Sequence, residues 1–118
     1  MFRFEQLEIW KHAIAYAKLG YKVVESLPKT EEFGLKSQMK RAYVSVPSNI
    51  AEGSGSVTTK GFCNYLDISI KSTLETVSQA LFAKELTYLN QNQVSELYGE
   101  AEHLIRRIRS FKRALNKK

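Results

Sequence analysis

The chain has 118 residues, of which 43% are hydrophobic and 25% are charged, and it carries a net charge of +6. These values are typical of one globular domain that needs no metal or disulfide to fold, and they exclude a disordered chain. Cys63 is the single cysteine, so an intramolecular disulfide is excluded and a reducing, cytoplasmic location is expected. No apolar run approaches the roughly 20 residues of a membrane span, so we expect no membrane contact.

Apolar residues in the first half of the chain recur at helical spacing and predict two helices, at about residues 5–27 and 31–52. The stripe of the first helix is Leu7, Trp10, Ile14, Ala17, Tyr21 and Val24, and that of the second is Leu35, Met39, Ala42, Val46 and Ile50. Pro28 is expected to end the first helix, and Thr30 can cap the second. Gly53 and Gly55 are expected to end the second helix by adopting left-handed backbone.

The second half of the chain predicts two longer helices, at about residues 59–89 and 93–115. Thr58 or Thr59 can cap the third helix, whose main stripe is Phe62, Leu66, Ile70, Leu74, Val77 and Leu81. A second apolar strip lies on its other side, formed by Ile68, Phe82, Leu86 and Leu89. Because a helix that is apolar on two sides needs two partners, we expect this strip to contact another subunit. The fourth helix has one unbroken stripe from Val94 to Leu115.

These patterns together indicate an all-α protein. Four helices joined by short turns, with almost no strand signal, most simply form an antiparallel up-and-down four-helix bundle. Residues 1–118 contain no linker, repeat or low-complexity stretch, so we expect a single domain.

A ladder of polar side chains runs along the second helix beside its apolar stripe and continues through Pro47. At about 100° per residue it falls within an arc of roughly 80° and consists of Gln38, Arg41, Ser45, Asn49 and Glu52. Polar groups at a core boundary need hydrogen-bond partners, so the ladder is either a structural lattice or a binding surface. We take the lattice as the working interpretation. The following "GSGS" lacks the lysine of a phosphate-binding loop and follows a helix, which argues against a nucleotide site.

The net charge is confined to the last segment. Residues 102–118 hold seven Lys or Arg and one acidic residue, whereas residues 1–101 hold eleven of each sign. Such a segment either favours a polyanionic partner or is a solvated helix end whose cations stabilise the helix dipole. For a polyanion, the candidate contacts are Arg106, Arg107, Arg109 and Arg113, with Lys36, Lys40 and Arg41 on the second helix as additions.

Metal and nucleophilic chemistry find little support in the sequence. Glu100 and His103 have the Glu-x-x-His spacing of a di-iron bundle, but that centre needs a second such motif, and His12 has Ile9 three residues before it. Cys63 has no histidine-bearing constellation beside it. We therefore expect no metal, no cofactor, no small-molecule substrate and no enzymatic activity.

Three stretches carry a resemblance to a known family: "FEQLEIW" at 4–10, "FGLKSQMKRAYVSVPSNIAEGSG" at 33–55 and "NYLDISIKSTLE" at 64–75. They resemble the bacterial 23S rRNA intervening-sequence proteins, four-helix bundles encoded within large-subunit ribosomal RNA genes and related in fold to accessory proteins of diversity-generating retroelements. The resemblance implies an up-and-down bundle, often a homopentameric ring, with a role in binding nucleic acid and no catalytic residues. It also adds Ser72 and Glu75, which match a family pattern in the third helix, to the polar lattice.

The sequence thus predicts a non-enzymatic, oligomeric four-helix bundle that binds RNA or structured nucleic acid through basic surfaces. The alternative is a protein-interaction scaffold with no nucleic-acid role, whose basic end only keeps it soluble.

Overall fold

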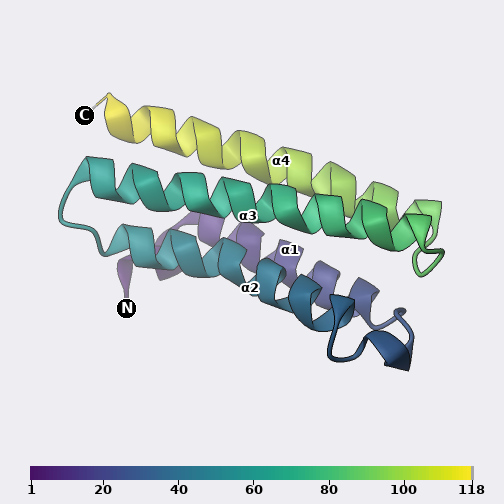
Figure 1. Ribbon diagram of the computed structural model, residues 1–118. Coiled ribbons are helices and arrows are strands. Elements are labelled where there is room, and N and C mark those ends of the chain that lie inside the picture. The colour runs from purple at the N-terminus through teal and green to yellow at the C-terminus, as the bar shows by residue number, and fades with distance from the viewer. Residues whose placement is uncertain (118) are drawn as a thin grey trace.

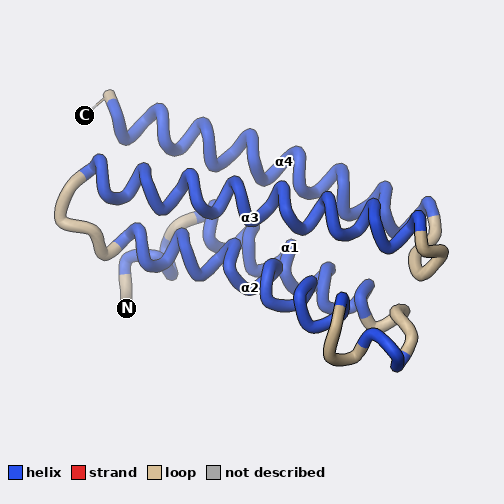
Figure 2. The backbone as a smooth tube through the Cα atoms, viewed as in Figure 1, coloured by secondary structure: helices blue, strands red, loops and turns tan. Residues whose placement is uncertain are grey.

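The protein consists of four long helices. A computed structural model describes residues 1–117, and within them no residue lies in a strand (Figure 2). The helices are α1 (Glu8–Val24), α2 (Leu35–Ser54), α3 (Thr59–Glu85) and α4 (Gln91–Asn116), with short 3-10 turns at Arg3–Gln6 and Lys29–Glu31. No helix in this part of the chain is both long enough and apolar enough to cross a membrane.

Each helix packs against the next one in the chain, and α4 also packs against α1. The pairs α1–α3 and α2–α4 therefore lie diagonally across an elongated particle of 47 × 24 × 21 Å. The α1–α2 and α3–α4 loops lie at one end, while the α2–α3 loop and both termini lie at the other (Figure 1). Side chains of all four helices meet in one hydrophobic core.

The apolar stripes predicted for α2 and α4 face the core. On α1 and α3, some residues of the predicted stripes are exposed instead. Tyr21 of α1 is 39% exposed, and Leu74 and Leu81 of α3 are 52% and 41% exposed. The buried positions on this half of α3 hold the small residues Thr73, Thr76, Ala80 and Ala83. Small side chains let neighbouring helices approach closely, and each threonine hydroxyl satisfies itself on a carbonyl of its own helix.

Two glycines mark close approaches between helices. A Cβ atom on Gly20 would lie 2.3 Å from the Tyr43 ring, and one on Gly53 would lie 2.7 Å from Tyr65 Cβ. No described glycine has a positive φ, and Gly55 at the end of α2 has φ −90°. The prediction that Gly53 and Gly55 adopt left-handed backbone is therefore wrong. Gly53 instead allows α3 to approach α2 closely.

The helix ends also differ in part from the predicted boundaries. α2 begins at Leu35 rather than near residue 31, and the Leu35 amide donates to Glu31 Oε1 at 3.1 Å, so Glu31 rather than Thr30 serves this end. Thr58 caps α3 as predicted, since its hydroxyl accepts from the Gly61 amide at 3.0 Å. α2 continues through Pro47 without interruption.

The end of α3 changes the position of one predicted interface residue. α3 stops at Glu85, and Thr87 has a left-handed φ of 63°. The chain turns there and returns Leu89 to the core, where it is 4% exposed. Leu89 is therefore not part of an exposed strip on α3.

Candidate nucleic-acid interface

The basic residues of α4 form an exposed surface. Within the described chain, Arg106, Arg107, Arg109 and Arg113 are all exposed. At about 100° per residue, Arg106, Arg109 and Arg113 fall within an arc of about 60°, whose centre is about 120° from that of the buried face of α4. Arg106 and Arg113 are two turns apart, about 11 Å along the axis, which corresponds to about three nucleotides of one strand. We call these four arginines the α4 arginine surface.

The α4 arginine surface keeps its charge free of carboxylates. Within residues 1–117, no ion pair includes any of the four arginines. Arg107 lies toward α1, where its Nη1 is 3.0 Å from Nδ1 of His12. Lys112 behaves differently, because its ammonium pairs with Asp67 of α3 at 2.7 Å. The arginines are thus the cations of α4 that a polyanion can reach without breaking an existing ion pair.

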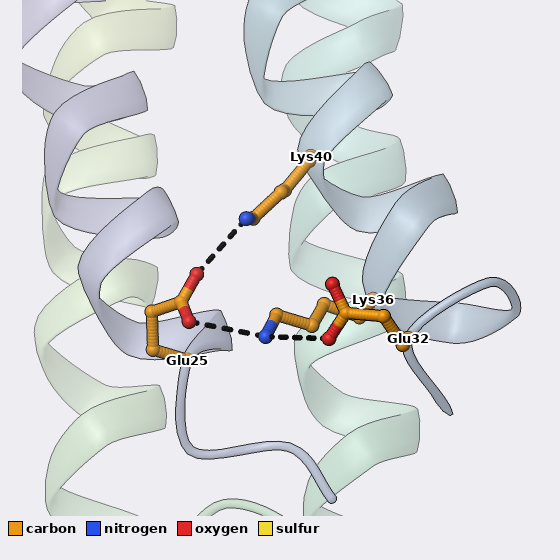
Figure 3. A network of polar contacts seen from close by, with 4 residues as sticks. All are labelled: Glu25, Glu32, Lys36 and Lys40. Carbon is orange, nitrogen blue, oxygen red and sulfur yellow. Dashed lines mark hydrogen bonds and ion pairs between the residues drawn. The ribbon is translucent and has the colours of Figure 1, made fainter. Parts of the chain in front are cut away.

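The two lysines of α2 that were candidates for phosphate contacts are engaged elsewhere. Figure 3 shows Glu25, from the end of α1, between Lys36 and Lys40 of α2, with Glu32 on the other side of Lys36. Lys36 Nζ lies 3.0 Å from Glu25 and 3.1 Å from Glu32, and Lys40 Nζ lies 2.9 Å from Glu25. Lys36 is also buried, at 8% exposure. Both lysines join α1 to α2, and we leave them out of the interface proposed below.

Titration of this network follows from its geometry. The Lys40 hydrogen bond, followed by that of Lys36, holds the pKa of the Glu25 carboxyl below its ordinary value. The hydrogen bonds to Glu25 and Glu32 raise the pKa of Lys36. Because the carboxylate form is the one that binds the lysines, the contribution of Glu25 to stability is present above its ordinary pKa of 4.5 and is lost as the pH falls below it.

Arg41 lies on another side of the bundle. It is exposed on α2, where it lines an open polar pocket of about 390 Å³ together with Gln38, Ser45 and Glu75 of α3. Since α2 and α4 are diagonal to each other, Arg41 does not join the α4 arginine surface within one chain.

Two members of the predicted polar lattice bond to the backbone of their own helix. Ser45 Oγ donates to the Ala42 carbonyl at 2.8 Å, and Asn49 Nδ2 donates to the Ser45 carbonyl at 2.8 Å. Among the described residues, no side-chain to side-chain hydrogen bond joins two of its seven members (Gln38, Arg41, Ser45, Asn49, Glu52, Ser72 and Glu75). The buried bond that does cross from α3 to α2 comes from Ser69, whose hydroxyl donates to the Val46 carbonyl at 2.8 Å. A core-facing serine has no distinctive signal in the sequence, so polar periodicity does not reveal it.

Three members of the predicted oligomer strip are exposed, two of them on α3 and Leu86 directly after its end. Ile68 is 44% exposed, Phe82 is 55% exposed and Leu86 is 39% exposed. Another apolar surface lies between α1 and α2, where Trp10, Ile14, Tyr21, Val44 and Pro47 help to line a groove of about 620 Å³. The apolar residues predicted for the core of α1 therefore contribute in part to an open groove.

The α1–α4 contact brings together side chains that no sequence pattern links. His12 of α1 lies beside Glu100 and His103 of α4. Burial lowers the pKa of His12, and this effect outweighs the hydrogen bond to Glu100, which acts in the opposite direction. The signal available in the sequence was that the first and last helices of a four-helix bundle can be neighbours, but their axial offset decides which residues meet.

Comparison with known protein families gives one match. The family model described as 23S rRNA-intervening sequence protein matches residues 5–110, which covers all four helices except the end of α4. No curated protein matches the chain.

Proposed function

The chain belongs to the 23S rRNA-intervening sequence protein family, and we propose that it is a non-enzymatic bundle that binds RNA or structured nucleic acid through the α4 arginine surface. The observation that carries this proposal is the exposure of four arginines without carboxylate partners, whereas Lys112 on the same helix and Lys36 and Lys40 on α2 are paired. The family's printed name, which refers to ribosomal RNA, agrees with an RNA partner. The protein would act in the cytoplasm.

Backbone phosphates are the expected target. Guanidinium groups bind phosphate oxygens in a bidentate manner and stay charged at all physiological pH values. Arginines on the outer side of a bundle helix, without an element that enters a groove, recognise charge and shape more than base sequence. Binding should therefore tolerate changes of sequence and depend strongly on salt.

The test is a salt titration of RNA binding. Changing Arg106, Arg107, Arg109 and Arg113 to glutamine should weaken binding to unrelated RNA sequences alike. Each lost phosphate contact flattens the plot of log affinity against log salt by about 0.7 for a single strand or 0.9 for a duplex, so the slope of the fourfold variant should be shallower by about 2.8 to 3.6. Arg41→Gln is the matched control, because it removes an exposed arginine on the diagonal helix and should leave the slope unchanged.

Two results would contradict the proposal. One is a wild-type protein that shows no salt-sensitive binding to RNA or DNA near physiological ionic strength. The other is a glutamine variant with the wild-type slope and an intact fold, as judged by circular dichroism.

We also infer an antiparallel up-and-down arrangement of the helices and a ring-shaped homo-oligomer, with a pentamer favoured by the family resemblance. Loops at alternate ends of the bundle support the first inference (Figure 1). The exposure of Ile68, Phe82 and Leu86 supports the second, because apolar side chains that gather on one helix favour contact with another chain. These side chains equally suit the alternative function, a protein-interaction scaffold without a nucleic-acid role.

Native mass measured by light scattering tests the ring. Phe82→Glu or Leu86→Glu should reduce the particle to smaller species while helix content is retained. Val57→Glu is the control, because Val57 is fully exposed in the α2–α3 loop. Retention of the wild-type mass by both α3 variants would remove this strip from the interface. If the ring forms but binds no RNA, the scaffold becomes the preferred function.

A further inference from the structure

Two histidines and a glutamate converge where α1 crosses α4. The potential ligand atoms of His12, Glu100 and His103 all lie within 4.8 Å of one another. His12 Nε2 is 3.3 Å from Glu100 Oε2, and the two imidazole rings are 5.1 Å apart between centroids. Glu100 and His103 are three residues apart on α4 and therefore project from the same side of that helix.

The spacing of these atoms suits a shared metal ion. Two ligand atoms bound to one tetrahedral Zn²⁺ at about 2.0–2.1 Å are about 3.3–3.4 Å apart, which is the separation that His12 and Glu100 already have. The side chain of His12 is 9% exposed, so packing holds this ligand in place. His103 is exposed and can complete the set by rotation of its side chain.

The sequence argument against a metal does not apply to this arrangement. A dinuclear iron centre needs two Glu-x-x-His motifs, whereas a mononuclear site needs a single motif and one further ligand. His12 supplies that ligand from the other end of the chain. Two imidazoles and a carboxylate favour Zn²⁺ or a related first-row ion over Mg²⁺ or Ca²⁺, which prefer oxygen ligands.

Arg107 lies on the opposite side of the His12 ring, and its hydrogen bond to His12 would compete with metal binding. A guanidinium only donates hydrogen bonds, so the 3.0 Å contact requires His12 Nδ1 to accept and Nε2 to carry the proton that faces Glu100. A metal ion bound to Nε2 would need a free lone pair on that nitrogen, so the ring proton would move to Nδ1. A protonated Nδ1 cannot accept a hydrogen bond from Arg107. Arg107 is exposed and can turn away into solvent.

We propose that His12, Glu100 and His103 bind one Zn²⁺-class divalent cation per chain, and that Arg107 leaves His12 when the cation binds. The three residues leave one coordination position open. A cavity of about 280 Å³ adjoins the site, lined by Tyr16, Leu19, Glu96 and Glu100 among others, and can admit water or a small ligand to that position. The bound ion would connect the first helix to the last.

Binding of Zn²⁺ to the untagged full chain, without nucleic acid, tests the proposal. Calorimetry should give one ion per chain, and Co²⁺ should give the visible absorption of a nitrogen- and oxygen-bound tetrahedral ion. Glu100→Gln and His103→Gln should each weaken binding more than about 100-fold, the upper end of the range seen when only a supporting group is lost. Glu102→Gln is the matched control on α4, and Cys63→Ser excludes binding through the thiol.

Arg107 provides the sharpest test. Arg107→Met removes both the competing hydrogen bond and a positive charge, so it should strengthen Zn²⁺ binding about tenfold. The proposal fails if Glu100→Gln and Glu102→Gln bind Zn²⁺ equally well, if the ratio of ions to chains is well below one, or if Arg107→Met weakens binding. Because no RNA is present, these outcomes are independent of the nucleic-acid proposal.

Discussion

The buried tyrosines Tyr16 and Tyr43 should respond in opposite ways to the loss of a hydroxyl group. They are 1% and 0% exposed, and their rings are 5.4 Å apart. Thr76 donates its only hydroxyl proton to the Thr73 carbonyl at 2.6 Å, so Tyr16 must be the donor in its 2.7 Å bond to Thr76. The Tyr43 hydroxyl has no hydrogen bond of ordinary length among the described residues, although the Tyr16 hydroxyl adds to the effect of burial in raising its pKa.

The magnitudes follow from these contacts. Tyr16→Phe removes a buried hydrogen bond and leaves Thr76 without its donor, which should lower the free energy of unfolding by about 1–2 kcal/mol. Tyr43→Phe removes a hydroxyl that loses its hydration on burial without a compensating hydrogen bond. The substitution should therefore leave the free energy of unfolding unchanged or raise it by about 1 kcal/mol. Urea unfolding followed by circular dichroism at pH 7 and fixed protein concentration measures both. A loss in Tyr43→Phe equal to that in Tyr16→Phe would refute the reasoning.

The same residues predict a loss of stability in alkali. Burial raises the pKa of Tyr16 from 10.0 to about 12 and raises that of Tyr43 further. Between pH 10.0 and about 12, Tyr16 loses its proton in the unfolded chain but keeps it in the folded protein. Stability is therefore intact below pH 10.0 and falls above it. For Tyr16 the loss amounts to about 2 kcal/mol by pH 12, because the slope of about 1.4 kcal/mol per pH unit diminishes as the folded tyrosine also begins to lose its proton. Tyr16→Phe should make the decline shallower, and an unchanged decline would argue against its burial.

Other contacts give further predictions. Gly20→Ala should cost about 1–3 kcal/mol in urea unfolding, since its Cβ would lie 2.3 Å from the Tyr43 ring. Gly99→Ala on α4, with nothing within 4 Å, should instead stabilise by about 0.5–1 kcal/mol, and equal effects would contradict the close approach. Lys36→Met should lower the melting temperature by removing an ion pair with Glu25, yet leave the salt dependence of RNA binding unchanged. A flatter salt dependence would return Lys36 to the nucleic-acid interface.

The local features of this protein can be predicted from its sequence alone. Apolar spacing predicts the four helices and the buried stripe of α2, and N-cap preference offers Thr58 or Thr59 for the start of α3, because each feature depends on residues within one or two turns of one another. The segregation of basic residues after residue 101 is likewise visible without coordinates. The quoted motifs were enough to indicate the family that the comparison then matched.

Which side of α1 and α3 is buried, and which distant side chains meet, depends instead on the packing of the whole fold. Thr73 lies in the core and Leu74 outside it, because the close packing of helices around this half of α3 leaves room for small side chains but not for large ones. Lys36 resembles any surface lysine in the sequence, and the end of α1 buries it between two carboxylates. His12 and Glu100 are 88 residues apart. Their contact depends on the rotation and axial offset of α1 against α4, which the packing of the whole core sets and no local pattern contains.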